Sequence, residues 1–191
     1  MRSSPVVIGF SGHRNLDHHE LVGTRIEQLL CELRDCASCA EHSVVVLTGV
    51  AEGADMLCVE AAMTLSIPTR VLLPLPEEQF SQDFSSPDLW NRAQLLIAKA
   101  QSQSIANPVC LIEGPPVRPH CYARLADNMV ESARILIAVW NGEPASGPGG
   151  TAEVVELARK RLLPLVLINP VDCTISFEGD VKLALQSKLQ C

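Results

Sequence analysis

Short, continuously apolar runs alternate with segments of helical periodicity along the chain, and this alternation most restricts its fold. The runs occupy residues 6–10, 44–47, 69–73, 109–112, 135–140 and 165–168. Such runs are typical of strands buried on both faces, which occur in parallel sheets covered by helices. We therefore predict an α/β fold with three layers: a mostly parallel sheet of about six strands, with helices on both faces.

Helices are predicted between the apolar runs. Apolar residues 22, 26, 29, 30 and 33 recur at helical spacing. Further helices are expected at 54–65, 89–100, 121–132 and 151–161, with a terminal helix over 178–189. Loops are expected at 76–87, 114–119 and 141–150. This order predicts a Rossmann-like fold, in which ligands bind beyond the carboxyl ends of the strands near the switch in strand order.

Composition narrows the class of protein. The chain has 191 residues, of which 47% are hydrophobic and 19% charged, which predicts one folded domain over residues 1–191. The net charge of -7 and the lack of a basic run argue against nucleic acid as the main partner. No apolar stretch reaches the roughly 18 to 20 residues of a membrane helix, and no secretory leader is evident. We expect no membrane association and a cytoplasmic location.

Eight cysteines raise the question of metal binding. The spacing of Cys31, Cys36 and Cys39 is similar to part of a plant-type iron–sulfur motif. A fourth ligand at suitable spacing is missing, and the group lies at the end of a predicted helix. We interpret the cysteines as free thiols and predict no metal site, no cofactor and no disulfide framework.

The first of three strand-end turns contains Gly12, His13 and Arg14. Gly12 permits a tight turn or close approach of a ligand. His13 offers a side-chain hydrogen bond, and Arg14 can pair with a phosphate in a forked geometry. The alternative is a plain turn with a solvated arginine.

The second turn contains Thr48, Gly49, Glu52, Gly53 and Asp55. Two glycines at a strand-to-helix turn leave backbone N–H groups and a helix dipole that favour an anion. The sequence favours a ligand-binding turn here. The alternative is a turn chosen for packing, with Asp55 compensating the helix dipole.

The third turn contains Gly147, Gly149, Gly150 and Thr151. Consecutive glycines before a helix form a concave backbone of N–H donors, and Thr151 can cap the helix or bind phosphate. The pattern is neither the dinucleotide fingerprint nor a P-loop, because it follows a late strand and no lysine follows Gly150. The alternative is a flexible loop with an ordinary cap.

Carboxylates at the helix starts refine the ligand class. Glu52, Asp55 and Glu153 would repel a phosphate, but they suit ribose hydroxyls, base amines or activation of water at a glycosidic carbon. Arg14 and Arg124 would supply positive charge. This mixture predicts a pocket for a nucleotide. For Glu153, dipole compensation is an equal alternative to catalysis.

Aromatic residues outside the three turns are further candidates. Tyr122 can stack on a base, or it is an ordinary rim aromatic. His120 could donate a proton, although a lone loop histidine is usually solvated. Phe80, Asp83 and Phe84 in the 76–87 loop could form a lid.

Three motifs in order resemble the SLOG superfamily, which includes the Lonely-guy phosphoribohydrolases, the DNA-processing protein A fold and nucleotide-sensing domains of bacterial defence. These are Gly-His-Arg at 12–14, Thr-Gly-Val-Ala-Glu-Gly-Ala-Asp at 48–55 and Gly-Pro-Gly-Gly-Thr-Ala-Glu at 147–153. The resemblance covers residues 5–170 and is closest to the nucleotide-sensor branch. It implies a nucleotide bound across the three turns and, by analogy, a homodimer.

Two departures from the Lonely-guy pattern bear on catalysis. The position three after Thr151 is Val154, with the carboxylate at Glu153, and Leu125 stands at the family's catalytic arginine, next to Arg124. Two main hypotheses stay open. One is a binding or sensing domain. The other is a hydrolase of the N-glycosidic bond of a nucleoside monophosphate, with Glu153 as base or stabiliser and Arg14 or Arg124 on the phosphate. Single-stranded DNA binding is a third, which the acidic balance opposes.

Overall fold

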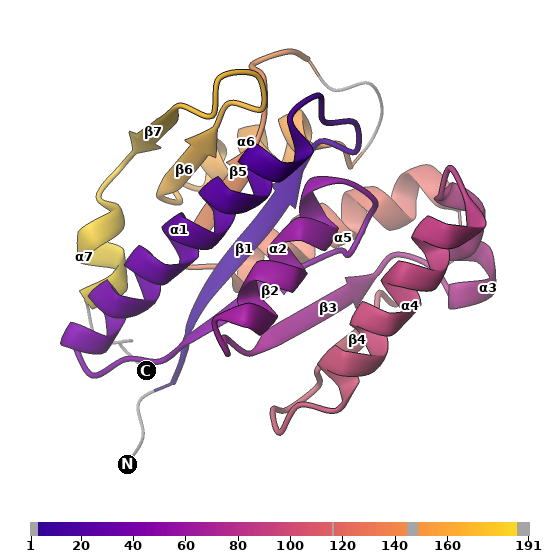
Figure 1. Cartoon of the computed structure of the whole chain (residues 1–191), viewed down its shortest axis with the longest axis horizontal. Helices are drawn as coiled ribbons and strands as arrows, with labels where there is room; N and C mark the ends of the chain where they lie inside the picture. The colour runs from indigo at the N-terminus through magenta and orange to yellow at the C-terminus, as the bar shows by residue number, and fades with distance from the viewer. Residues whose placement is uncertain (1–3, 116, 145–148, 187–191) are drawn as a thin grey trace.

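The computed structural model describes residues 4–115, 117–144 and 149–186, which form three layers around a seven-stranded sheet (Figure 1). The strand order is β4-β3-β2-β1-β5-β6-β7. The strands are β1 (Val6–Gly12), β2 (Val44–Thr48), β3 (Thr69–Leu73), β4 (Val109–Leu111), β5 (Ile135–Val139), β6 (Leu165–Ile168) and β7 (Ile175–Glu178). The first six strands are parallel, and β7 runs antiparallel to β6.

Helices cover both faces of the sheet. They are α1 (His19–Cys39), α2 (Ala54–Thr64), α3 (Glu77–Phe80), α4 (Pro87–Gln101), α5 (Arg118–Ser132), α6 (Thr151–Lys160) and α7 (Val181–Gln186), with a 3₁₀ turn, η1 (Ser81–Asp83). The α1, α2, α4 and α7 helices pack on one face, and α5 and α6 pack on the other (Figure 1). The predicted three-layer α/β fold is confirmed.

The central strands are buried on both sides. Ile8 and Phe10 of β1 belong to the apolar cluster under α1 and α2, whereas Leu136 and Ala138 of β5 belong to the cluster under α5 and α6. All four side chains are inaccessible to solvent. Because each face is covered by helices, the central strands need apolar residues at consecutive positions, which explains the continuous runs.

Two predictions of local structure were wrong. Strand β7 was not predicted, and residue 178 ends this strand instead of starting the terminal helix; α7 covers only Val181–Gln186 of the described residues. The predicted 76–87 loop contains α3 and η1. All three missed elements have six residues or fewer, so none spans enough positions to show a clear period.

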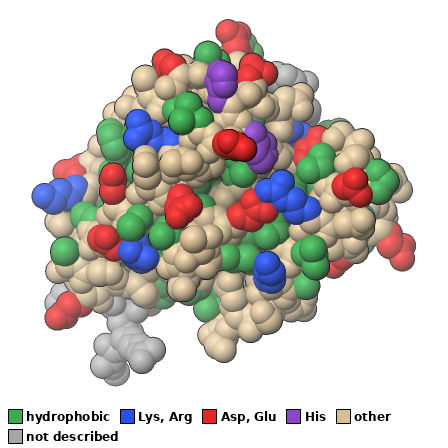
Figure 2. All heavy atoms as spheres, viewed as in Figure 1, with side chains coloured by type: hydrophobic (Ala, Val, Ile, Leu, Met, Phe, Trp, Pro, Cys, Tyr) green, Lys and Arg blue, Asp and Glu red, His purple; other side chains and the backbone are tan. Residues whose placement is uncertain are grey.

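The cysteines of the described residues are free thiols, and Cys31, Cys36 and Cys39 all lie on α1. Within the described ranges no group of three or more His, Cys, Asp or Glu residues is placed to hold a metal ion. No helix in that part of the chain combines the length and apolar character that a membrane crossing demands. On the face in Figure 2, Lys and Arg side chains are scattered among acidic ones and form no continuous basic patch.

The direction of winding reverses beside β1. From β1 the chain moves outward through β2 and β3 to β4, and it then returns to place β5 on the other side of β1. The register aligns Ile8 with Ile135 and Gly12 with Val139. Parallel strands that leave in opposite directions create a crevice at their carboxyl ends, which is the usual ligand position in such sheets.

Candidate functional site

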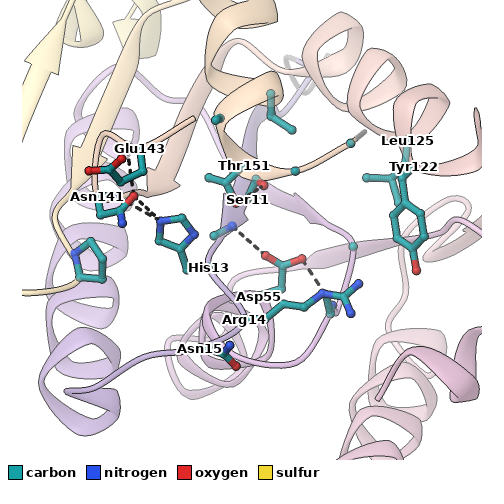
Figure 3. A pocket seen from close by; sticks show the side chains of 18 of the residues that line it. Ser11, His13, Arg14, Asn15, Asp55, Tyr122, Leu125, Asn141, Glu143 and Thr151 are labelled. Atoms are coloured by element: carbon teal, nitrogen blue, oxygen red, sulfur yellow. Dashed lines mark hydrogen bonds between the residues drawn. The ribbon is translucent and has the colours of Figure 1, made fainter. Parts of the chain in front are cut away.

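A cavity of about 660 Å³ opens at the carboxyl ends of the strands, above β1 and β5 (Figure 3). This volume is typical of sites for small molecules. The lining comes from the end of β1, from the turns after β1, β2, β3, β5 and β6, from α3 and α5, and from the first turns of α2 and α6. Among its residues are Ser11, Gly12, His13, Arg14, Asp17, Gly49, Asp55, Phe80, Tyr122, Leu125, Asn141, Glu143, Gly149, Gly150 and Thr151.

Asp55 is the buried charged group of this cavity. It lies in the first turn of α2 with 7% of its surface exposed. One carboxylate oxygen accepts a hydrogen bond from Gly12 N–H at 3.1 Å, and the other accepts from Ala51 N–H at 3.4 Å (Figure 3). Burial raises the pKa of Asp55 from its ordinary value of 3.8 to about 7, opposed by these two N–H groups and by the Arg14 charge.

Glycines bring the first two turns into direct contact. Gly53 has a φ of +90°, and a Cβ atom there would lie 2.2 Å from the Arg14 carbonyl oxygen. A Cβ on Gly12 would lie 2.4 Å from Cβ of Ala54. The Ala54 N–H donates to the His13 carbonyl at 3.0 Å. The turn after β1 therefore rests on the start of α2, with no room for a side chain between them.

Val50, between these turns, has an unusual backbone. Its φ is +55°, in the left-handed region that β-branched residues rarely adopt, and its side chain is fully buried. Such conformations persist where the surrounding packing imposes them, and they are common at ligand sites.

The start of α6 forms the opposite wall of the pocket. Gly150 precedes the helix, and the N–H groups of Thr151 and Ala152 have no intrahelical partner because they belong to its first turn. Ser11 Oγ lies 3.4 Å from Thr151 Oγ1, which connects this helix to the end of β1. These N–H groups and the helix dipole favour an anion or an oxygen acceptor.

A second side of the pocket is cationic and aromatic. The Arg14 guanidinium carbon lies 5.9 Å from the centre of the Tyr122 ring (Figure 3). Arg14 Nη1 donates to the Asp83 carbonyl at 2.9 Å, and the Tyr122 hydroxyl donates to the Asp83 carboxylate. Burial, reinforced by this hydrogen bond, raises the pKa of Tyr122, so its hydroxyl remains a donor at neutral pH.

Sequence reasoning missed a third, polar side. His13 Nε2 lies 3.0 Å from Asn141 Oδ1 and 3.1 Å from the Asn141 backbone nitrogen (Figure 3). Glu143 N–H donates to Asn141 Oδ1 at 3.0 Å. The position of Asn141 directly after β5, at the switch point, was a signal that could have identified it.

Most of the predicted ligand-binding residues converge on the pocket. Those that line it are Gly12, His13, Arg14, Gly49, Asp55, Tyr122, Gly149, Gly150 and Thr151. Gly147 lies outside the described residues.

Thr48 and Gly53 lie beneath the pocket without lining it, and the Thr48 side chain is fully buried. Glu52 also points elsewhere, because its carboxylate accepts from Ser85 N–H at 2.9 Å. His120 is exposed on α5 and does not line the pocket.

The two predicted catalytic residues do not line the pocket either. The Glu153 carboxylate turns back to accept a hydrogen bond from Gly149 N–H, as a capping residue does. Arg124 Nη2 donates to the Pro115 carbonyl at 2.8 Å. The structure therefore does not bring Glu153 and Arg124 together at the pocket.

The fold and the pocket define a doubly wound, Rossmann-like α/β protein with a small-molecule-sized cavity at its switch point. Neither a comparison with protein-family models nor one with curated proteins finds a match. The structure is similar to the X-ray structure of DNA processing protein A (DprA) from Streptococcus pneumoniae. The TM-score is 0.59 at 14% sequence identity, over 86% of this chain and 50% of that one.

A second similarity is to the molybdenum cofactor binding protein from the phototrophic bacterium Rippkaea orientalis. Its TM-score is 0.47 at 18% identity, over 87% of this chain and 77% of that one. The chain thus spans about half the length of the DNA processing protein. At 14% identity the likeness to the DNA processing protein concerns the fold alone.

Proposed function

We propose that this protein binds a nucleotide or nucleotide-derived small molecule in the pocket at the switch point. The observation that carries the proposal is the convergence of three sequence-distant turns, at residues 11–14, 49–55 and 149–151, around one cavity of about 660 Å³. Rossmann-like sheets bind ligands at this position, and the size suits a small molecule of this class.

The charges of the lining suit different parts of such a ligand. An anionic group would bind at the start of α6, where the N–H groups of Thr151 and Ala152 are available, and Arg14 would add positive charge. Asp55, Glu143 and Asn141 offer oxygen acceptors for hydroxyl or amine donors. A nucleotide presents both kinds of group, whereas bare phosphate would leave the acceptors unused.

Binding is better supported than cleavage. The hydrolase hypothesis needs Glu153 at the ligand, with Arg14 or Arg124 on the phosphate. Arg14 lines the pocket, but Glu153 accepts from Gly149 N–H and Arg124 donates to the Pro115 carbonyl. Binding without turnover would suit a sensing role.

The first test is a panel of nucleoside monophosphates, dinucleotides and cyclic nucleotides, screened by thermal shift and then measured by calorimetry. Arg14→Gln and Thr151→Val should each weaken the binding of a hit roughly tenfold. Arg161→Gln, beyond the far end of α6, and Thr64→Val, at the end of α2, are matched controls. We expect them to leave affinity unchanged.

Two results would contradict the proposal. One is that no member of the panel binds and that mass spectrometry finds no nucleotide-type ligand in the purified protein. The other is a hit whose affinity falls equally in the controls. Release of free base from a monophosphate, abolished by Glu153→Gln, would restore the hydrolase hypothesis.

A further inference from the structure

Asp83, the last residue of η1, contacts three residues from two other parts of the chain. Its carboxylate accepts hydrogen bonds from Arg118 Nη1 and from the Tyr122 hydroxyl, both on the first turns of α5. Its backbone carbonyl accepts from Arg14 Nη1, in the turn after β1, at 2.9 Å. One residue that does not line the pocket thus contacts two that do, Arg14 and Tyr122.

The segment that presents Asp83 is itself anchored. Arg118 Nη2 donates to the Gln79 carbonyl and to Gln82 Oε1, each at 2.9 Å. The Phe80 side chain is 1% exposed, and its ring meets Phe84 edge-on with centroids 5.2 Å apart. The position of Asp83 is therefore determined by packing on α3 and α4 as well as by its own contacts.

We propose that Asp83 is a positioning residue of the ligand pocket, holding the Arg14 guanidinium and the Tyr122 ring in the arrangement that receives the ligand. The ligand part of this inference rests on the proposed function. Arg14 and Tyr122 come from elements far apart in the sequence, yet they meet at 5.9 Å while both hydrogen-bond to Asp83. Arg14 uses Nη1 for this bond, and its side chain still lines the pocket, where it can serve a ligand.

Without the Asp83 carboxylate, Arg118 loses its ion pair and the Tyr122 hydroxyl loses its charged acceptor. The ligand would then have to order the Tyr122 side chain when it binds, and the entropy cost of this ordering would lower its affinity. Asp83→Asn keeps the size and the backbone carbonyl but removes the charge. Glu78→Gln is the matched control, because Glu78 is an exposed carboxylate on the same segment with no side-chain hydrogen bond among the described residues.

The positioning can be tested without any ligand. Tyr122 is the only tyrosine of the chain, so labelling with 3-fluorotyrosine gives a single fluorine resonance. We expect that resonance in Asp83→Asn to move towards its position in the urea-unfolded protein, and in Glu78→Gln to stay at the wild-type position. An unchanged resonance in a folded Asp83→Asn protein would overturn the proposal. If Asp83→Asn fails to fold, Arg118→Gln removes the same ion pair from a half-exposed partner and should give the same displacement.

The effect on binding is tested with adenosine monophosphate as the probe. Asp83→Asn should weaken its binding about tenfold, and Glu78→Gln should not. In a Tyr122→Phe background, Asp83→Asn should cost less than about twofold more, because both changes act on the one hydrogen bond between the Tyr122 hydroxyl and the Asp83 carboxylate. Full additivity of the two losses would overturn the proposal. If the wild type does not bind this probe, that result counts against the proposed function, and the fluorine measurement alone decides on Asp83.

Discussion

The backbone N–H of Gly12 donates to the carboxylate of Asp55 at 3.1 Å, which joins the end of β1 to the first turn of α2. Through its other oxygen Asp55 also accepts from Ala51 in the turn after β2. A single buried side chain thus connects two of the three turns that form the pocket.

This connection predicts a pH-dependent stability. The pKa of Asp55 is about 7 in the fold and 3.8 in the unfolded chain, so the folded state binds the extra proton between these values. The stabilisation is complete below about pH 4 and is lost as the pH rises through about 7. Relative to Asp55→Asn, the wild-type free energy of unfolding should fall by about 4 kcal/mol over this range.

Urea unfolding at a series of pH values measures this difference. Thr64→Val, at an exposed position at the end of α2, changes no titratable group and is the control, so its difference from wild type should stay flat. The prediction fails if the difference in unfolding free energy between wild type and Asp55→Asn also stays constant with pH. Asp55 would then be ionised in the folded protein over the whole pH range measured.

The contact between the first two turns predicts a large effect at Gly53. An alanine there combines a φ of +90° with a clash against the Arg14 and His13 carbonyl oxygens, at 2.2 and 2.5 Å. We expect Gly53→Ala to lose more than about 3 kcal/mol of unfolding free energy. Gly142 has nearly the same φ, +89°, but nothing lies within 4 Å of its Cβ position. Gly142→Ala should therefore lose only about 1 kcal/mol, and equal losses in thermal or urea unfolding would exclude the clash.

The 77–83 segment owes its position to Phe80. Phe80 is buried and packs against Phe84 and Trp90 while also lining the pocket. Phe80→Ala should lower the unfolding free energy by roughly 3 to 5 kcal/mol. Phe177, which is 60% exposed on β7, gives the comparison, and Phe177→Ala should change stability by less than about 1 kcal/mol. A small effect at Phe80 would mean that this segment is not packed as described.

The hydrogen bond that the Glu153 carboxylate accepts from Gly149 is predicted to stabilise the fold. Glu153→Ala removes this acceptor and should therefore lose about 1 kcal/mol of unfolding free energy. Glu156→Ala, three residues along α6 and exposed, should lose less. Chemical unfolding of both variants decides the point: equal stabilities would argue that the Gly149 contact contributes nothing.

Much of the sheet and part of the pocket could be predicted from the sequence. The central strands are recognisable because burial on both faces demands consecutive apolar residues, as in β5. The turns with Gly12, Gly49 and Gly149 follow from strand-to-helix junctions at one edge of a parallel sheet. The residue type alone does not specify the direction in which a side chain points. Glu153 and Arg124 have suitable chemistry for catalysis, but their side chains hydrogen-bond to nearby backbone groups.

Other features depend on contacts between distant segments. Asp83 was considered only as part of a lid, since nothing local shows that Arg118 and Tyr122 meet it. Strand β7 is partly exposed, so its four residues lack the apolar continuity of the inner strands.

The pairing of β1 with β5 also has a consequence for assembly. The Ile8 and Ile135 partners come from opposite parts of the chain, and everything between them must be synthesised before they can meet. Contacts of such high sequence separation are slow to form. The wall of the cavity that follows β5 therefore does not exist in a nascent chain that ends after β4, and we expect such a chain not to bind the ligand of the complete protein.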